Sequence, residues 1–321
     1  GEKGSCGETM LVYLARRVVY TIPILLGVAL VCFALVHIAP GDPLVSVLPP
    51  DASAELQAQL RALYGFDQPY AVQFLRWLWR ALHGDLGTSI ASGRSVTTEV
   101  FTAVGYTVRL ALLATAIGFF FGCLFGFVAG YYRGSAMDRL ASIVSVLGVS
   151  VPHYWLGMVL VIIFSAILGW LPPTGAGNEG GFWEFARHMI LPAITMSVIP
   201  MGIVARTVRA LVADILAQEF VVGLRAKGLT DRGIFAHVVK NAAPTALAVM
   251  GLQLGYLLGG SILIETVFSW PGTGFVLNNA IFQRDLPLLQ GTILVLALFF
   301  VILNLVVDVL QTSLDPRIQR S

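Results

Sequence analysis

Long runs of uncharged, mostly apolar residues alternate with short polar segments along the whole chain. A membrane-spanning helix needs about 20 consecutive apolar residues. Runs that reach or approach this length without an Asp, Glu, Lys or Arg cover residues 18–39, 110–132, 189–205, 242–264 and 286–307. This pattern predicts an all-α, polytopic membrane protein.

A sixth uncharged run, residues 140–178, is too long for one span and cramped for two. It contains Pro152, and a proline ring removes a backbone hydrogen bond from a helix. We interpret the run as one span broken at Pro152 that ends in a loop at Leu171-Pro-Pro-Thr-Gly. The total is then about six spans, although two spans within this run remain an alternative.

The distribution of basic residues favours an even number of spans. Six spans place both termini on one side, and the positive-inside rule makes the side richer in Lys and Arg cytoplasmic. Splitting the broken run would move the basic cluster at residues 206–240 outside, against that rule. The basic residues that fall on the cytoplasmic side are Arg16, Arg17, Arg133, Arg139, Arg206, Arg209, Arg225, Lys227, Arg232, Lys240, Arg317 and Arg320.

The segments between the spans suggest a division of the chain. Residues 1–9 are polar and precede Met10, so we exclude them from the fold as an extension. Residues 10–106 hold the first span and an outer segment with amphipathic helices at 52–64 and 72–82. Aromatic side chains beside arginines suit a membrane–water interface, so the outer segment is a helical cap, a docking surface for an external partner, or both. A core at 107–312 with a loop at 213–244, and a cytoplasmic tail at 313–321, complete the division.

The loop at 213–244 is charged and predicts a helical hairpin. Residues 211–226 contain good helix formers, and Gly228 supplies a turn because glycine accepts a positive φ. Thr230 or Asp231 caps a second helix that starts near Arg232. Exposed apolar residues in such a hairpin would need a partner surface, whereas a hairpin packed on the chain's own spans is the alternative. The apolar residues concerned are Val221, Leu224, Leu229, Ile234 and Phe235.

Glycines recur every four residues in two of the predicted spans. This spacing places them on one helix face, where a smooth ridge allows close helix approach within lipid. Packing within the chain and a seam or gate against another subunit are both compatible with the pattern. The ridges are Gly118, Gly122, Gly126 and Gly130 in one span, and Gly251, Gly255 and Gly259 in another.

The composition and the motifs that the sequence lacks exclude several classes of protein. Hydrophobic residues make up 57% and charged residues 12%, which excludes an ordinary soluble globule. A net charge of +2 gives no indication of nucleic-acid binding. Three scattered cysteines show neither disulfide nor metal-ligand spacing. The chain lacks a phosphate-binding G-x-x-x-x-G-K-[ST] motif, since Leu229 stands where the lysine is required. We therefore expect a non-enzymatic subunit without its own ATPase site or cofactor.

Two other functional classes of membrane protein fit the sequence less well. An ion-coupled secondary carrier usually has carboxylates within the membrane, but Glu265 and Asp308 lie at span ends. A membrane-embedded enzyme needs a polar catalytic group at depth, and none is evident. The carrier remains the weaker alternative, and transport driven by an ion gradient without ATPase partners would identify it.

Several motifs, in order from residue 10 to the end, resemble the permease subunits of bacterial ATP-binding-cassette importers, in the dipeptide and oligopeptide branch. Glu219-Phe-Val-Val-Gly-Leu-Arg-Ala-Lys-Gly-Leu is similar to the cytoplasmic signature of that family, with Phe220 and Val221 in place of two alanines. The long outer segment resembles the first of the two permeases. Further matching motifs are Pro40-Gly-Asp-Pro, Gly84-Asp-Leu-Gly, Lys240-Asn-Ala, Glu265-Thr-Val-Phe-Ser-Trp-Pro-Gly and Asp315-Pro-Arg-Ile.

The resemblance implies a type I importer permease fold in the bacterial inner membrane. It implies a second homologous permease, two ATPase subunits that bind ATP and Mg, and a periplasmic binding protein as partners. The hairpin would be the coupling helix seated on an ATPase, so Gly228→Asp should abolish transport but not insertion. The coupling candidates are Glu219, Leu224, Arg225, Lys227, Gly228, Leu229, Ile234, His237 and Asn241, and the periplasmic-side candidates are Asp42, Asp85, Glu265, Trp270 and Pro271.

The substrate is the least defined part of the prediction. The resemblance implies dipeptides or oligopeptides, with nickel or glutathione importers of the same family as alternatives. A nickel site would need His or carboxylate ligands, and the sequence shows no such cluster.

Overall fold

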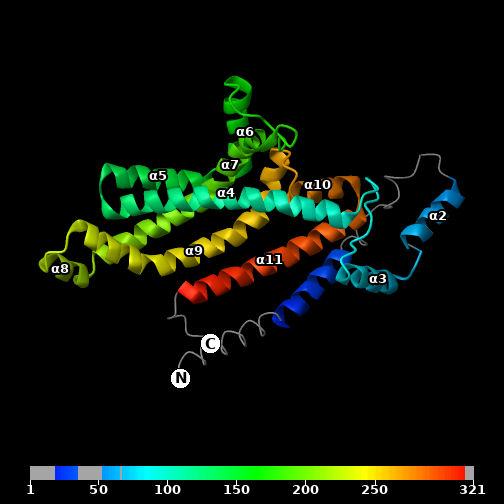
Figure 1. Cartoon of the computed structure of the whole chain (residues 1–321), viewed down its shortest axis with the longest axis horizontal. Coiled ribbons are helices and arrows are strands. Elements are labelled where there is room, and N and C mark those ends of the chain that lie inside the picture. The colour runs from blue at the N-terminus through cyan, green and yellow to red at the C-terminus, as the bar shows by residue number, and fades with distance from the viewer. Residues whose placement is uncertain (1–18, 35–52, 66, 315–321) are drawn as a thin grey trace. The chain divides into compact units, whose positions relative to one another are not determined.

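The computed structural model describes residues 19–34, 53–65 and 67–314, and their regular structure is helical. After an apolar helix, Val19–Ala34, come two outer-segment helices, as expected. The labelled helices are α2 (Ala54–Tyr64), α3 (Tyr70–Leu82), α4 (Val96–Tyr131), α5 (Ala136–Ser150), α6 (His153–Val161), α7 (Gly181–Leu216), α8 (Glu219–Ala226), α9 (Asp231–Val267), α10 (Thr273–Gln283) and α11 (Leu286–Leu314) (Figure 1). A π-helical segment, Ile162–Ile167, continues α6.

The apolar helices agree with the predicted spans. Three are long and apolar enough to cross a membrane: α4, α7 and the Leu286–Val307 part of α11. Two bent pairs pass the same test together, and Val19–Ala34 is a shorter apolar helix. Both α4 and α7 are 36 residues long, so they extend well past the uncharged runs from which they were predicted.

The break predicted at Pro152 is confirmed. Helix α5 ends at Ser150, α6 begins at His153, and the two axes meet at 100°. Pro152 occupies the N-cap of α6, where its missing N–H leaves no helical bond unmade. The second bent pair lies within α9, where Asp231–Leu257 and Ser261–Val267 meet at 50°.

The chain forms two compact units. One consists of the residues up to Gly105 with Gly272–Leu305, and the other of Tyr106–Pro271 with the residues from Val306. Within the second unit, α7 packs against α5, α6 and α9 (Figure 1). A cluster of buried apolar residues packs α7, α8 and α9 together at one end of this unit. Its members are Val204, Val208, Val212, Ile215, Val221, Ile234, Val238, Ala242 and Ala246.

In the first unit, Asp285 joins a loop to the start of α11. The carboxylate is fully buried, accepts a hydrogen bond from the Leu288 amide at 3.1 Å and so caps α11. It also accepts hydrogen bonds from the Ser89 hydroxyl and the Ala91 amide. The polar loop before α4 is thereby held by a single buried carboxylate.

Candidate functional site

The hairpin predicted at 213–244 is formed by the end of α7, α8 and the start of α9. At the C-terminus of α8 the Leu229 amide donates to the Leu224 carbonyl at 3.2 Å, and the Gly228 amide donates to the Arg225 carbonyl at 2.9 Å. These two bonds form a Schellman motif, which requires a left-handed residue at the turn. Gly228 supplies it with a φ of 78°, as the sequence predicts.

The second helix begins where its cap was expected. Thr230 has an extended backbone, and its side chain accepts a hydrogen bond from the Gly233 amide at the start of α9. Of the two predicted caps, Thr230 is therefore the observed one, and Asp231 is the first helical residue. A carboxylate in the first turn also interacts favourably with the helix dipole.

The inner face of the hairpin packs on the chain's own helices. Val221 and Ile234 are almost completely buried in the apolar cluster at this end of the unit. The Phe235 ring contacts the Phe127 ring edge-on, with centroids 4.5 Å apart. The hairpin is therefore fixed to α4, α7 and α9 as part of the folded unit.

Two expectations about this hairpin were wrong. Val221 and Ile234 are buried rather than exposed, so Ile234 supports the hairpin from within and does not present itself to a partner. The helix expected over 211–226 is two helices, because the chain turns at Ala217 and Gln218 before α8 begins. That turn is what allows Val221 to reach the core.

The outer face of the hairpin combines apolar and charged side chains. Val222 is 63% exposed and Phe220 is 39% exposed. Sequence reasoning noted Phe220 only as a departure from alanine and did not single out Val222. Five predicted polar residues are exposed, and two apolar ones are half-buried. The exposed residues are Glu219, Arg225, Lys227, His237 and Asn241, of which Asn241 bonds the His237 carbonyl, and the half-buried ones are Leu224 and Leu229.

The glycine ridge of α4 packs against α7 of the same chain. A Cβ built on Gly126 would lie 2.5 Å from the Ala205 carbonyl oxygen, and one on Gly130 would lie 2.7 Å from that of Arg209. Equivalent Cβ atoms on Gly118 and Gly122 would come within 3.0 Å of α7 backbone oxygens. The ridge is therefore an intrachain packing surface.

The second glycine ridge is less fully described. Gly251 and Gly255 are buried within α9. Gly259 belongs to the same helix, but its surroundings lie outside the described residues. A role for this ridge at a seam or gate stays a prediction.

Glu265 and Trp270 are buried rather than presented on a surface. The Glu265 carboxylate accepts a hydrogen bond from the Thr107 hydroxyl at 2.8 Å, and its carbonyl accepts one from the Trp270 amide. The Trp270 indole N–H donates to the Tyr106 carbonyl, and its ring packs against Phe185. These contacts fasten the end of α9 to Tyr106 and Thr107 of α4, within the second unit. Pro271 follows directly and is half-buried.

Of the two aspartates predicted on the periplasmic side, Asp42 lies outside the described residues. Asp85 forms an exposed ion pair with Arg80 at 2.8 Å. Its pKa is lowered, first by a hydrogen bond from the Gly87 amide and then by Arg80. Asp85 consequently stays ionised and orders the turn after α3.

Sequence reasoning missed a buried ion pair that joins α5 to α7. Asp138 is 4% exposed, and both its oxygens accept hydrogen bonds from the Arg209 guanidinium. The Gly134 amide and the Ser142 hydroxyl also donate to it. No local signal could reveal this pairing, since 71 residues separate the partners.

We expect Arg209→Met to lower the free energy of unfolding by about 3 kcal/mol. This figure is at the low end for a broken buried pair, because Arg209 is about one third exposed. The double variant Arg209→Met with Asp138→Asn should recover part of the loss, since the buried charge is gone. Thermal unfolding of the wild type, the two single variants and the double variant in one detergent measures both effects. An additive double variant would contradict the pairing argument.

Comparisons with known proteins cover almost the whole chain. The family model described as "Binding-protein-dependent transport system inner membrane component" matches residues 122–320. Its N-terminal companion, "Binding-prot-dependent transport system membrane comp, N-term", matches residues 10–98.

Several curated relatives align with 97% of the length of this chain. The dipeptide transport system permease protein DppB of Alkalihalophilus pseudofirmus is 37% identical and is covered completely. The glutathione transport system permease protein GsiC of Salmonella paratyphi A is 39% identical, with 99% of its length covered. The di/tripeptide transport system permease protein DppB of Pseudomonas aeruginosa is 37% identical, also with 99% covered.

Solved structures share the fold. A chain of the inward-facing MetNI methionine ABC transporter superposes with a TM-score of 0.55 at 16% identity, over 67% of this chain and 96% of that one. A chain of an amino acid ABC transporter gives a TM-score of 0.50 at 16% identity, over 69% of this chain and 95% of that one. The helical arrangement is that of ABC transporter permeases.

Proposed function

Because this chain belongs to the family of binding-protein-dependent transport system inner membrane components, we propose that it is a permease subunit of an ATP-driven importer of short peptides. Support for the substrate class comes from relatives named for dipeptide, di/tripeptide and glutathione transport. All three are peptides, with glutathione a tripeptide. A path used by such ligands must accept varied side chains rather than one fixed ligand set.

Glutathione is the second candidate substrate, favoured by relatives at 38–39% identity over 97% of this chain. The two candidates are separated by uptake into cells that depend on this transporter. Labelled dipeptides and labelled glutathione are offered in turn, each with the other in excess as competitor. Dipeptide uptake that glutathione does not inhibit supports the first candidate, whereas the reverse result supports the second.

The hairpin around α8 is the docking site for an ATPase subunit. One observation carries this assignment: the hairpin is fixed on its inner face by Val221 and Ile234, yet exposes Val222 and Phe220 on its outer face. A rigid element whose outer surface carries both apolar and charged side chains can bind a partner and transmit its displacement. Two ATPases, a second homologous permease and a periplasmic binding protein complete the assembly.

In this arrangement α8 and both chain termini face the cytoplasm. The basic residues of the hairpin, Arg225, Lys227 and Arg232, are all exposed. Cytoplasmic loops carry an excess of such residues. The start of α4 and the segment that contains Trp270 then lie toward the periplasm.

Val222→Glu is expected to reduce ATP-driven uptake by the assembled transporter by about tenfold or more. The reason is that docking would bury the new carboxylate without a partner. The side chain is 63% exposed, so the chain itself should fold and insert normally. Val222→Ile, which keeps the apolar surface, serves as the matched control. Uptake and co-purification of the ATPase are measured for both variants, and full activity of the glutamate variant would refute the docking site.

A further inference from the structure

Helix α3 of the outer segment has apolar residues on two faces. Phe74 and Trp77 form ring contacts with Phe33, at centroid distances of 5.3 and 6.4 Å. Other apolar side chains follow a spacing of three and four residues, which places them on one helical face. These are Val72, Leu75, Trp79 and Leu82, with exposed fractions of 37%, 63%, 66% and 74%.

A second exposed apolar face belongs to the helix that precedes α2 in the same unit. Phe33 lies near the C-terminal end of the helix Val19–Ala34, which exposes Ile22, Leu26 and Leu30. Exposed apolar faces of this kind mark membrane or protein contacts. A helix with Trp79 on one side and arginines beside it is typical of the membrane–water boundary. We therefore place α3 at the level of the lipid headgroups.

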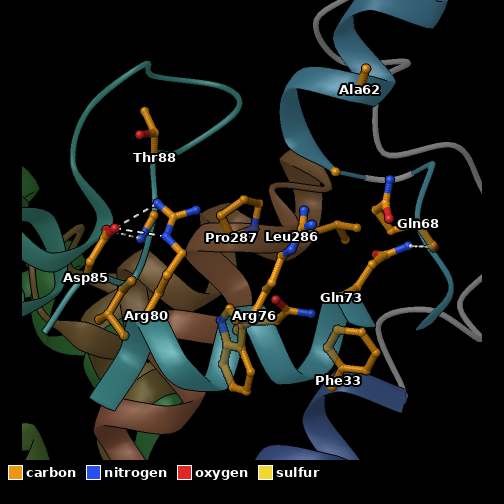
Figure 2. A pocket seen from close by; sticks show the side chains of 15 residues that line it. Phe33, Ala62, Gln68, Gln73, Arg76, Arg80, Asp85, Thr88, Leu286 and Pro287 are labelled. Carbon is orange, nitrogen blue, oxygen red and sulfur yellow. Dashed lines mark hydrogen bonds and ion pairs between the residues drawn. The ribbon is translucent and has the colours of Figure 1, made fainter. Parts of the chain in front are cut away.

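A cavity of about 480 Å³ opens beside α3 in the same unit. Figure 2 shows Arg76 and Arg80 extending from α3 toward Leu286 and Pro287. The residues that line the cavity are Phe33, Ala62, Gly65, Gln68, Gln73, Arg76, Trp77, Arg80, Asp85, Leu86, Gly87, Thr88, Leu286, Pro287 and Gln290.

The two arginines of this cavity differ in their partners. Arg80 is neutralised by Asp85, whereas Arg76 makes no ion pair within the part of the chain that the structure describes. An unpaired guanidinium beside an open cavity fits an anion with several acceptor oxygens, and the planar donors of arginine match the geometry of phosphate.

We propose that this cavity binds the phosphate of an anionic phospholipid, with Arg76 as the main contact. The apolar wall formed by Leu286, Pro287 and Phe33 suits the glycerol and upper acyl region of a lipid better than free phosphate. The exposed face of α3 lies against the same lipid layer. The bound lipid fixes the outer segment to the membrane surface, a role separate from peptide transport and from the α8 hairpin.

The test uses the full-length chain, purified in a neutral detergent and titrated with phosphatidylglycerol while native mass spectrometry counts bound lipid. Arg76→Gln should raise the dissociation constant roughly tenfold, the size expected for a lost charge-assisted hydrogen bond. Arg94→Gln is the matched control, because Arg94 is exposed in the same unit but does not line the cavity. Circular dichroism confirms that both variants keep their helix content.

Two further arms identify the source of the phosphate. Phosphatidylcholine should bind the wild type more weakly than phosphatidylglycerol does, because its quaternary ammonium offsets the charge of the phosphate that Arg76 contacts. Inorganic phosphate should not displace phosphatidylglycerol. Equal phosphatidylglycerol binding by the wild type and Arg76→Gln would overturn the proposal, and so would displacement by inorganic phosphate, which would indicate a free-anion site.

Discussion

Gly228→Val is expected to abolish ATP-driven uptake while the chain still inserts in the membrane. Gly228 has a φ of 78°, and no atom lies within 4 Å of the position that its Cβ would take. The cost therefore comes from backbone conformation alone, about 1–2 kcal/mol for an ordinary residue and more for a β-branched one. The turn relaxes, and α8 loses the orientation that docking requires.

Two companion variants separate conformation from charge at this position. Asparagine tolerates the left-handed region, so Gly228→Asn should keep most of the transport activity. Gly228→Asp has the same shape with a negative charge and should lose activity through the docking surface. Uptake by the assembled transporter is compared at equal membrane levels. Normal uptake by Gly228→Val would show that the turn geometry is not required.

Gly126→Ala is expected to destabilise the protein more than any other alanine substitution on the α4 ridge. The new Cβ would meet the Ala205 carbonyl oxygen at 2.5 Å and the Val208 Cβ at 2.8 Å. Backbone atoms cannot move aside as a flexible side chain can, so α4 and α7 must separate. Overpacking of this kind costs about 1–3 kcal/mol, and occasionally more.

The same ridge supplies a graded series and a control. At Gly118 the nearest α7 atom, the Ser197 oxygen, lies 3.0 Å away, so Gly118→Ala should be milder. Gly105, also on α4, has open space around its Cβ, and Gly105→Ala should be neutral or slightly stabilising through helix propensity. Thermal unfolding in detergent ranks the three variants. Equal melting temperatures for Gly126→Ala and Gly105→Ala would contradict close packing of α4 on α7.

Local chemistry made several elements predictable from the sequence. Gly228 favours a left-handed turn because glycine accepts a positive φ. Thr230 is a good cap, and Pro152 favours a helix break because its ring removes a backbone hydrogen bond. Each of these signals is contained within a few residues. The structure agrees at all three positions.

Features that depend on distant contacts could not be predicted in the same way. The spacing of Gly118–Gly130 identifies a helix face but not its partner, so intrachain packing and a subunit seam remained equal alternatives. Burial of Val221 follows from the turn at Gln218, and α8 is too short for its periodicity to predict that turn. The pairing of Asp138 with Arg209 depends entirely on how α5 and α7 meet.

The contact of α4 with α7 limits the motions that these helices can make. Glycines bring the two backbones together at four successive turns, so no side chains separate the backbones there. Rotation of α4 by one residue, about 100°, would drive Phe119 or Phe121 into the α7 main chain. The two helices therefore move as one rigid body. A conformational change must displace both helices together or bend the chain beyond their ends.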